Sequence, residues 1–386
     1  MIPRAPEAVA ALTAAIAGLA PLVRRHRASF DAARRLPDEV VRAAAEAGLF
    51  RLFLPRWMSG PELSPLDFME VVEAAAAVDG SFGWIVANGG GMSRIAGYVA
   101  PDVARAWFAD PLAFVASATG ATGTARPVDG GYRVSGRWPF ASGIHHATIV
   151  MALAAVAGAP AGDPPRVLCC HMARAEVSDV DTWHVSGLRG TGSCDFVAED
   201  VFVPAGHIHE FPVQRPADGG ALYRLPNMSV FPWTVAVVPL GIARAAIDCF
   251  AATAAPRSRG AGPALRDRET VQAEVGRADA LLRAGRAFLI AAMTELMAAN
   301  DAGDDGRLVE ARAVLRTACA HAAESANAII DRLSATAGAI SIFESCDLER
   351  CARDVHAATR HIAMSPASYI LNGRLVLGLD PAGIRF

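Results

Sequence analysis

Apolar and polar positions follow two different periods along the chain, and the changes of period divide it into three parts. Over residues 6–92, apolar residues recur at the three- and four-residue spacing of helices. From Phe114 to about Pro204 they alternate with polar residues, and glycine and β-branched residues become frequent, which predicts strands. From Met228 onward the helical spacing returns.

The C-terminal part has the longest apolar repeats, and their length and alanine content are typical of a four-helix bundle. The predicted helices cover residues 233–254, 267–299, 305–337 and 347–370. The chain is therefore expected to be an α+β protein of three domains. These are an N-terminal helical domain (1–112), a central β-barrel or β-sandwich domain (113–211) and a C-terminal four-helix bundle (212–386).

The composition excludes several function classes. The chain has 386 residues, 53% of them hydrophobic, which is enough for a large core. Its net charge of −3 provides no bulk attraction to nucleic acid or to an anionic membrane. It contains no lysine, which excludes lysine Schiff-base chemistry and P-loop nucleotide binding. We also expect no apolar run of membrane-spanning length.

The cysteines and the N-terminus give expectations about the compartment. Seven cysteines form no Cys-x-x-Cys pair, and their number is odd. This predicts neither a disulfide framework nor a zinc site, and it favours the reducing cytoplasm. Arg4 and Glu7 interrupt the N-terminal apolar stretch, so we expect no signal peptide.

The clearest candidate chemistry lies in residues 130–147. Asp129-Gly130-Gly131 provides the positive φ of a hairpin, and a strand carrying Trp138 and Phe140 is expected to break at Ser142-Gly143. A hydroxyl residue and a glycine at a strand end let backbone N–H groups and a hydroxyl approach a flat ring system. An ordinary sheet with a buried Trp explains this stretch equally well when it is taken alone. A second stretch, residues 183–193, favours the ring-binding interpretation.

The order of helices, β domain and long-helix bundle resembles the acyl-CoA dehydrogenase superfamily. Within it, the chain is most similar to the oxygenase components of two-component flavin monooxygenases. The resemblance extends over nearly the full length. Its motifs are Leu36-Pro37-Asp38, Asp79-Gly80-Ser81-Phe82-Gly83-Trp84, residues 130–147, Gly187-Leu188-Arg189-Gly190-Thr191-Gly192-Ser193, Phe202-Val203-Pro204, and residues 266–272 and 350–361.

The resemblance implies a reaction and its partners. Reduced flavin (FMNH2 or FADH2) reacts with O2 to give a C4a-hydroperoxide, which hydroxylates or N-oxidises a small organic substrate of aromatic or polyketide type. The reduced flavin comes from a separate NAD(P)H-dependent flavin reductase, and the enzyme is a homotetramer. The sequence agrees with a separate reductase because Gly190-x-Gly192 lacks the third glycine and the strand–turn–helix context of a dinucleotide fingerprint.

The resemblance also implies which residues meet the flavin. Ser142 is expected beside flavin N5, and the candidate residues around the isoalloxazine are Trp138, Phe140, Ala141, Ser142 and Gly143. A second set is expected to reach the flavin of another subunit, and its members are Arg257, Arg266, Gln272, Gly338 and Ala339. Arginines in such runs are more often a solvated face.

His361 is the candidate acid–base group. In relatives, an Arg-Asp pair is followed seven residues later by a His that faces flavin and substrate, and Asp354 and His361 have this spacing. On one helix they would lie on nearly one face. A neutral imidazole there can bind the peroxide or accept a substrate proton. The alternative is a surface His on an amphipathic helix.

Three further residues are candidates for the substrate side: Trp84, Asn88 and His145. Trp84 and Asn88 are one helical turn apart, and a core Trp with a buried Asn is an equally good interpretation. His145 follows the strand break and could reach the same pocket. No metal site is expected, since no third ligand is placed near His145 and His146.

A second function class competes with the oxygenase. Ile342-Phe343-Glu344-Ser345 resembles the Tyr-Glu-Gly segment that carries the catalytic base of many acyl-CoA dehydrogenases, which hold FAD tightly. Here Ser replaces the Gly, and the spacing to Arg350 is one residue short. These departures and the Asp354…His361 spacing favour the oxygenase.

Overall fold

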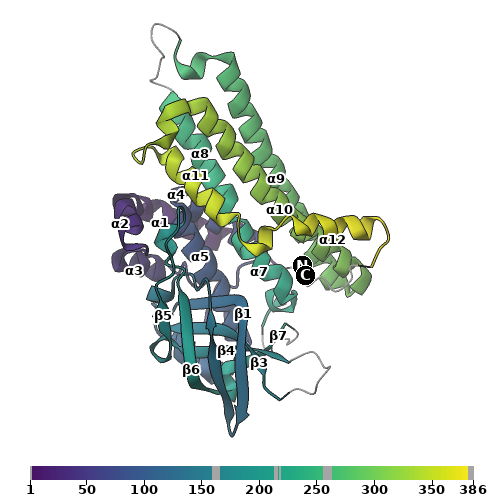
Figure 1. Ribbon diagram of the computed structural model, residues 1–386. Helices are drawn as coiled ribbons and strands as arrows, with labels where there is room; N and C mark the ends of the chain where they lie inside the picture. The colour runs from purple at the N-terminus through teal and green to yellow at the C-terminus, as the bar shows by residue number, and fades with distance from the viewer. Residues whose placement is uncertain (1, 159–165, 213–215, 217–218, 255–262, 381–386) are drawn as a thin grey trace.

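The computed structural model describes residues 2–158, 166–212, 216, 219–254 and 263–380. The long C-terminal helices form one end of the molecule and the β domain forms the other (Figure 1). The N-terminal helices lie beside the junction between these two parts. Sites that face the junction can therefore draw residues from all three parts of the sequence.

The N-terminal part is helical, as predicted. Its helices are α1 (Pro6–Arg25), α2 (Arg27–Ala33), α3 (Asp38–Glu46), α4 (Pro65–Val78), α5 (Gly80–Met92) and α6 (Pro101–Phe108). The predicted start at Leu36-Pro37-Asp38 is correct, since α3 begins at Asp38 directly after Pro37. Helix α5 is buried over most of its length. A Cβ at Gly83 would clash with the backbone of Ala76, so α4 and α5 cross closely.

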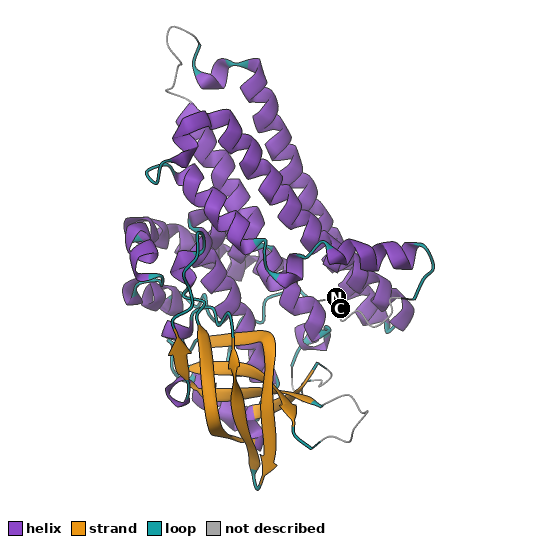
Figure 2. Cartoon of the chain, viewed as in Figure 1, coloured by secondary structure: helices purple, strands orange, loops and turns teal. Residues whose placement is uncertain are grey.

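The described strands of the β domain form one mixed sheet (Figure 2). They are β1 (Val115–Val128), β2 (Gly131–Trp138), β3 (Ile149–Val156), β4 (Val167–Ala173), β5 (Ser178–Val180), β6 (Asp195–Pro204) and β7 (Ile208–Phe211). Their order is β5-β6-β2-β1-β3-β4-β7, with β1 and β3 parallel and the other neighbours antiparallel. The predicted hairpin at residues 129–131 joins β1 to β2. Phe140 was expected within the strand, but β2 ends at Trp138.

The C-terminal part contains the predicted bundle, formed by α8 to α11. Its helices are α7 (Asn227–Ala236), α8 (Val238–Ala254), α9 (Glu269–Ala302), α10 (Asp305–Ala337), α11 (Asp347–Ala358) and α12 (Ala367–Val376). The prediction of one helix over 347–370 was wrong. Helix α11 ends at Ala358, and Pro366 disfavours helical backbone at the residue before it.

Within the described residues, two helical stretches are long and apolar enough to cross a membrane by length and composition alone, Pro6–Arg25 and Asn227–Ala254. The prediction that no stretch reaches this length was therefore wrong. The second stretch has 67% of its most apolar window buried inside the protein. A central bundle helix needs an apolar surface of this kind to pack against its neighbours.

Candidate active site

Trp84 on α5 connects the two residues for which the sequence predicts a catalytic role. Its indole Nε1 donates a hydrogen bond to Ser142 Oγ over 3.0 Å. Its ring centroid lies 5.7 Å from that of His361. The indole is only 7% exposed, so it holds this position within the core. A helix of the N-terminal domain, the turn after β2 and the turn after α11 thus meet at one point.

The hydroxyl of Ser142 begins a chain of hydrogen bonds whose direction is fixed. Thr191 Oγ1 donates to the carbonyl of Leu188 (2.9 Å), so it must accept from Ser193 Oγ (2.7 Å). Ser193 must then accept from Ser142 Oγ at 2.8 Å. Since Ser142 also accepts from Trp84, one acceptor site remains on its oxygen. Ser142 can therefore receive a further N–H or O–H, and it cannot donate without reorganising the chain.

The turn from Phe140 to Gly143 presents an aromatic surface beside this hydroxyl. Phe140 has a φ of 65°, which is unfavourable for a non-glycine residue, and its side chain is 66% exposed. Its ring lies edge to face against Trp183 at 6.4 Å. Gly143 (φ 76°) closes the turn by donating its N–H to Thr191 O. The exposed ring and the free acceptor of Ser142 fit a flat cofactor with an N–H at its edge, such as reduced flavin.

His361 is a neutral imidazole of known tautomer. Burial, with a smaller contribution from Arg316, lowers the pKa of His361 to about 4. Its Nδ1 accepts a hydrogen bond from the Ala363 N–H over 3.1 Å, so the proton lies on Nε2. His361 is therefore positioned to donate a hydrogen bond through Nε2. Of the two roles that the sequence left open, the structure favours binding an oxygen atom over accepting a proton.

The expected common face of Asp354 and His361 is absent. Asp354 lies within α11, whereas His361 follows the end of that helix in extended backbone (φ −66°, ψ 138°). Asp354 contacts the Leu188 N–H instead, at 2.7 Å. The seven-residue spacing is present, but two helical turns do not connect the residues. His356 pairs with Asp331 on the surface of the bundle.

A cavity of about 450 Å³ lies next to the turn that follows His361, although His361, Trp84 and Ser142 are not among the described residues that line it. Asn88 lines it, and so do Ile362 and Ala363, which directly follow His361 in the chain. The His361 ring also lies 6.0 Å from that of Phe231, another lining residue. Most of the wall is apolar, with Met92, Ile95, Met151, Leu153, Phe211 and Val230 among its residues. Its size and lining are typical of a site for a small organic molecule.

Several predicted site residues lie elsewhere. Trp138 and Ala141 have no exposed surface, and the Trp138 indole donates to Leu153 O in the core of the β domain. The structure thus places Trp138 beneath the site, not on its surface. His145 is 3.6 Å from both an Asp179 oxygen and the Cys194 sulfur, and it is not among the described residues that line the cavity.

Four of the five residues predicted to reach another subunit's flavin are described, and they lie on or directly beside the helices of the bundle. Arg266 and Gln272 are exposed, and Gln272 Nε2 donates to Arg266 O. Gln272 lies in the first turn of α9, a helix that begins at the end of the bundle remote from the β domain (Figure 1). Gly338 and Ala339 begin the short helix η9 (Gly338–Ile342) after α10. Arg257 lies outside the described residues. Contact of this set with a neighbouring flavin stays a prediction.

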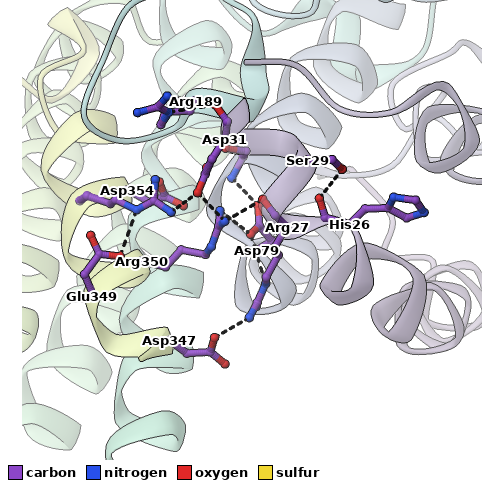
Figure 3. A network of polar contacts seen from close by, with 12 residues as sticks. His26, Arg27, Ser29, Asp31, Asp79, Arg189, Asp347, Glu349, Arg350 and Asp354 are labelled. Carbon is purple, nitrogen blue, oxygen red and sulfur yellow. Dashed lines mark hydrogen bonds and ion pairs between the residues drawn. The ribbon is translucent and has the colours of Figure 1, made fainter. Parts of the chain in front are cut away.

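A buried charge network connects α11 to the N-terminal helices and to the loop that carries the hydroxyl chain (Figure 3). Asp79 Oδ2 lies 3.4 Å from both Arg27 Nε and Arg350 Nη1. Asp31 Oδ2 pairs with Arg350 Nη2 (2.9 Å) and with Arg353 Nη2 (2.6 Å). The Asp354 bond to the Leu188 N–H completes the link. Sequence reasoning missed this network, since Asp354 served only to mark a spacing.

Replacement of Asp354 by Asn is expected to change how stability depends on pH. Burial and the charge of Asp79 raise the pKa of Asp354 from 3.8 to about 7, so the folded state binds this proton more tightly than the unfolded state. The contribution of the group to stability is present at low pH and is lost as pH rises toward 7. Arg350 and Arg353 oppose the shift without reversing it.

Melting temperatures measured at pH 5 and pH 8 test this expectation. The asparagine amide oxygen in Asp354→Asn can still accept from the Leu188 N–H, so the variant should gain stability relative to the wild type as pH rises. A variant that instead loses stability relative to the wild type between pH 5 and pH 8 would contradict the raised pKa of Asp354.

Sequence reasoning also missed a polar group in the cavity wall, consisting of Arg94, Tyr98, His209 and Asn227. A signal was present: Arg94 is the first charged residue after Asp79, at the end of the uncharged stretch 80–93. A charged residue at the end of a buried helix needs a reason. Burial of Arg94 depends on residues far along the chain, which the local pattern does not show.

Comparison with known proteins agrees with this architecture. Residues 10–112 match the acyl-CoA dehydrogenase N-terminal domain, and residues 233–366 match the acyl-CoA dehydrogenase C-terminal domain. The chain is 31% identical to the indole-3-acetate monooxygenase of Pseudomonas putida over 366 residues, which cover 93% of this chain and 91% of that protein. It is 30% identical to the flavin-dependent monooxygenase oxygenase subunit HsaA of Mycobacterium tuberculosis over 382 residues, or 95% of each chain.

Among solved structures, the fold matches that of XiaF from Streptomyces sp. in complex with FADH2 and glycerol. The TM-score is 0.89 at 27% identity, and the match covers 99% of this chain and 98% of that one. The chain therefore belongs to the acyl-CoA dehydrogenase superfamily and, within it, to the oxygenase components of flavin-dependent monooxygenases.

Proposed function

We propose that this protein takes reduced flavin from a separate reductase and uses it with O2 to oxygenate a small aromatic molecule held in the cavity beside His361. The bound reduced flavin supplies the activation of O2. The observation that carries the proposal is the junction at Trp84, where an acceptor (Ser142) and a neutral donor (His361) meet next to an apolar cavity.

The chain's own residues have distinct tasks in this proposal. Ser142 accepts a hydrogen bond from the edge of the flavin, and its fixed direction favours a cofactor that carries an N–H there. His361 Nε2 donates to an oxygen atom at the reacting centre. The apolar wall excludes water, which protects a reactive group from breakdown to hydrogen peroxide.

The acyl-CoA dehydrogenase alternative is disfavoured. Its base would be Glu344, which is exposed in the turn between η9 and α11. The relatives named above are monooxygenases, in agreement with this geometry.

Rapid mixing of the reduced-flavin complex with O2 tests the proposal without knowledge of the substrate. Flavin absorbance should return in two resolved phases. Anaerobic addition of butyryl-CoA to the oxidised complex should leave the flavin oxidised, and its reduction would establish the dehydrogenase instead. Indole-3-acetate and resorcinol, named for relatives from Pseudomonas putida and Rhizobium, are the first substrates to test with ¹⁸O2.

Replacement of Ser142 by Ala is expected to shorten the interval between the first phase and the second, because that interval is the lifetime of the state that the Ser142 hydrogen bond stabilises. Loss of one hydrogen bond costs about 1 kcal/mol, or roughly a five-fold change in rate. Ser193→Ala is the companion variant, because it leaves the Ser142 oxygen in place and removes only the acceptor of the Ser142 proton. Equal phases in wild type and Ser142→Ala would show that Ser142 does not contact the flavin.

We further propose a homotetramer formed through the C-terminal helices, located in the cytoplasm, where the reductase also acts. Apolar side chains stay exposed on η9 and α12 and after α12, including Ile342, Phe343, Ile370, Val376 and Leu377. Exposed apolar side chains of this kind are typical of interfaces between subunits.

Light scattering should give a mass near four times the chain mass of 40.3 kDa. Val376→Glu combined with Leu377→Glu should lower that mass, because burial of two carboxylates in an apolar interface is unfavourable. A fully active monomer would exclude the tetramer.

A further inference from the structure

The cavity contains a buried arginine without an ionic partner. Arg94 is 6% exposed and lines the cavity. Its Nη2 donates to the carbonyls of Leu222 (3.3 Å) and Leu225 (2.9 Å), while its Nε is buried without a partner. Arg94 forms no ion pair with any carboxylate of the described residues. A buried charge in this state is costly unless a ligand of opposite charge binds beside it.

Polar side chains surround Arg94 in the same wall. The Tyr98 ring lies 5.4 Å from Arg94 Cζ, and Tyr98 OH donates to Asn227 Oδ1 over 2.8 Å. His209 packs 5.0 Å from the Tyr98 ring, and its buried Nδ1 has no partner. Burial, His171 and Arg94 all lower the pKa of His209, so its imidazole is neutral. Arg94 is therefore the one charged member of this group.

A second arginine adds to the positive charge. Arg316 on α10 lines the cavity and donates from Nη2 to Ile362 O (3.3 Å), next to His361. The described lining residues include no Asp or Glu. The cavity thus has two guanidinium groups, largely apolar walls and no compensating carboxylate. Such a site favours an anion with an apolar body.

We propose that the substrate is an aromatic carboxylate whose acid group is bound by Arg94. This proposal names the substrate class for the proposed function. Only the reaction is taken from that function, whereas the binding of the acid is argued from the cavity itself. The apolar wall holds the ring, and the carboxylate replaces the missing ionic partner of Arg94.

The test is calorimetric binding to the full-length protein, with 1-naphthylacetate as probe and neutral 1-naphthylacetamide as its matched control. The wild type should bind the acid at least 10-fold more tightly. Arg94→Gln should weaken binding of the acid by roughly 10- to 100-fold and that of the amide by less than 3-fold, because a charge-assisted bond is lost. Arg94→Lys should retain part of the preference.

Arg105→Gln is the control for loss of a positive charge elsewhere, since Arg105 is exposed on α6 and stacks over Trp57. It should leave both affinities unchanged. Equal binding of acid and amide, no measurable binding of either, or an equal loss of both in Arg94→Gln would each overturn the proposal. A folding defect in Arg94→Gln would not imitate a selective loss of acid binding, because misfolding weakens the binding of the acid and of the amide alike.

The flavin phosphate is another source of negative charge, and a second arm of the experiment distinguishes it. If Arg94 binds that phosphate, Arg94→Gln will weaken the binding of FMN but not the binding of riboflavin. That result would overturn the proposal. If acid selectivity holds while butyryl-CoA reduces the bound flavin, the proposed reaction fails and the binding assignment stands. If flavin reoxidises in two phases without acid selectivity, only the substrate class is wrong.

Discussion

Replacement of His361 by Asn is expected to lower coupled product formation by roughly 10²-fold, the usual scale for loss of a positioned donor at the reacting centre. The asparagine Oδ1 can take the place of His361 Nδ1 and accept the Ala363 N–H. The donor at Nε2 is lost. The fold should therefore be kept, and the melting temperature should stay close to that of the wild type.

His361→Gln is the complementary variant, because the Gln amide reaches the position of Nε2 and loses the bond to Ala363. It should keep more activity and lose more stability than His361→Asn. The measurements are product and hydrogen peroxide formed per flavin oxidised. In His361→Asn, flavin oxidation should continue while the oxygen leaves as hydrogen peroxide. Coupling at the wild-type level in His361→Asn would remove His361 from the reacting centre.

Because its pKa is about 4, His361 should not determine the pH dependence of the reaction between pH 6 and pH 9. A base that must lose its proton would produce a limb in that range only if its pKa lay there. The structure thus changes the expectation from the sequence, which placed the imidazole pKa near the working pH. Burial against Trp84 and Phe231, together with Arg316, accounts for the change.

The fold could be predicted because the apolar period changes where the architecture changes. A break inside residues 347–370 could have been predicted, because Pro366 is visible in the sequence. The end of α11 at Ala358, eight residues earlier, could not, since the pattern there stays helical while the backbone of His361 is extended. The same limit applies to the strand that ends at Trp138. Such ends depend on contacts made by residues far away in the sequence.

The site could be predicted in part. Ser142, Trp84 and His361 came from motifs, and the structure brings them into contact. The direction of the hydroxyl chain could not be predicted, because it depends on the carbonyl of Leu188. The buried state of Arg94 depends on Leu222 and Leu225, more than a hundred residues later in the chain. A sequence pattern shows which residue types are present. Whether a charged side chain is buried without an ionic partner is decided only when the chain folds.

The charge network under α5 explains how the site keeps its geometry. Asp79 has no exposed side-chain surface, and its Oδ1 caps α5 by accepting from the N–H groups of Ser81 and Phe82 (3.0 and 3.2 Å). Its Oδ2 faces two arginines. Helix α5 carries Trp84 and Asn88, so its start is fixed by the same carboxylate that pairs with α11.

Replacement of Asp79 by Ala is therefore expected to lower the free energy of unfolding by about 3–5 kcal/mol, the cost of leaving buried charges without their partner. Loss of the cap accounts for about 1 kcal/mol of this. Asp79→Asn keeps an acceptor for the cap and should lose less stability than Asp79→Ala.

Removal of the Asp79 charge also lowers the pKa of Asp354, which can then ionise beside Arg350 and replace part of the missing charge. The double variant Asp79→Asn, Asp354→Asn should thus be less stable than the sum of the two single effects predicts. Urea unfolding of the wild type, the two Asn single variants and the double variant at pH 6, where wild-type Asp354 still holds its proton, measures this coupling. An Asp79→Ala protein within about 1 kcal/mol of the wild type would show that the network does not hold α5 in place.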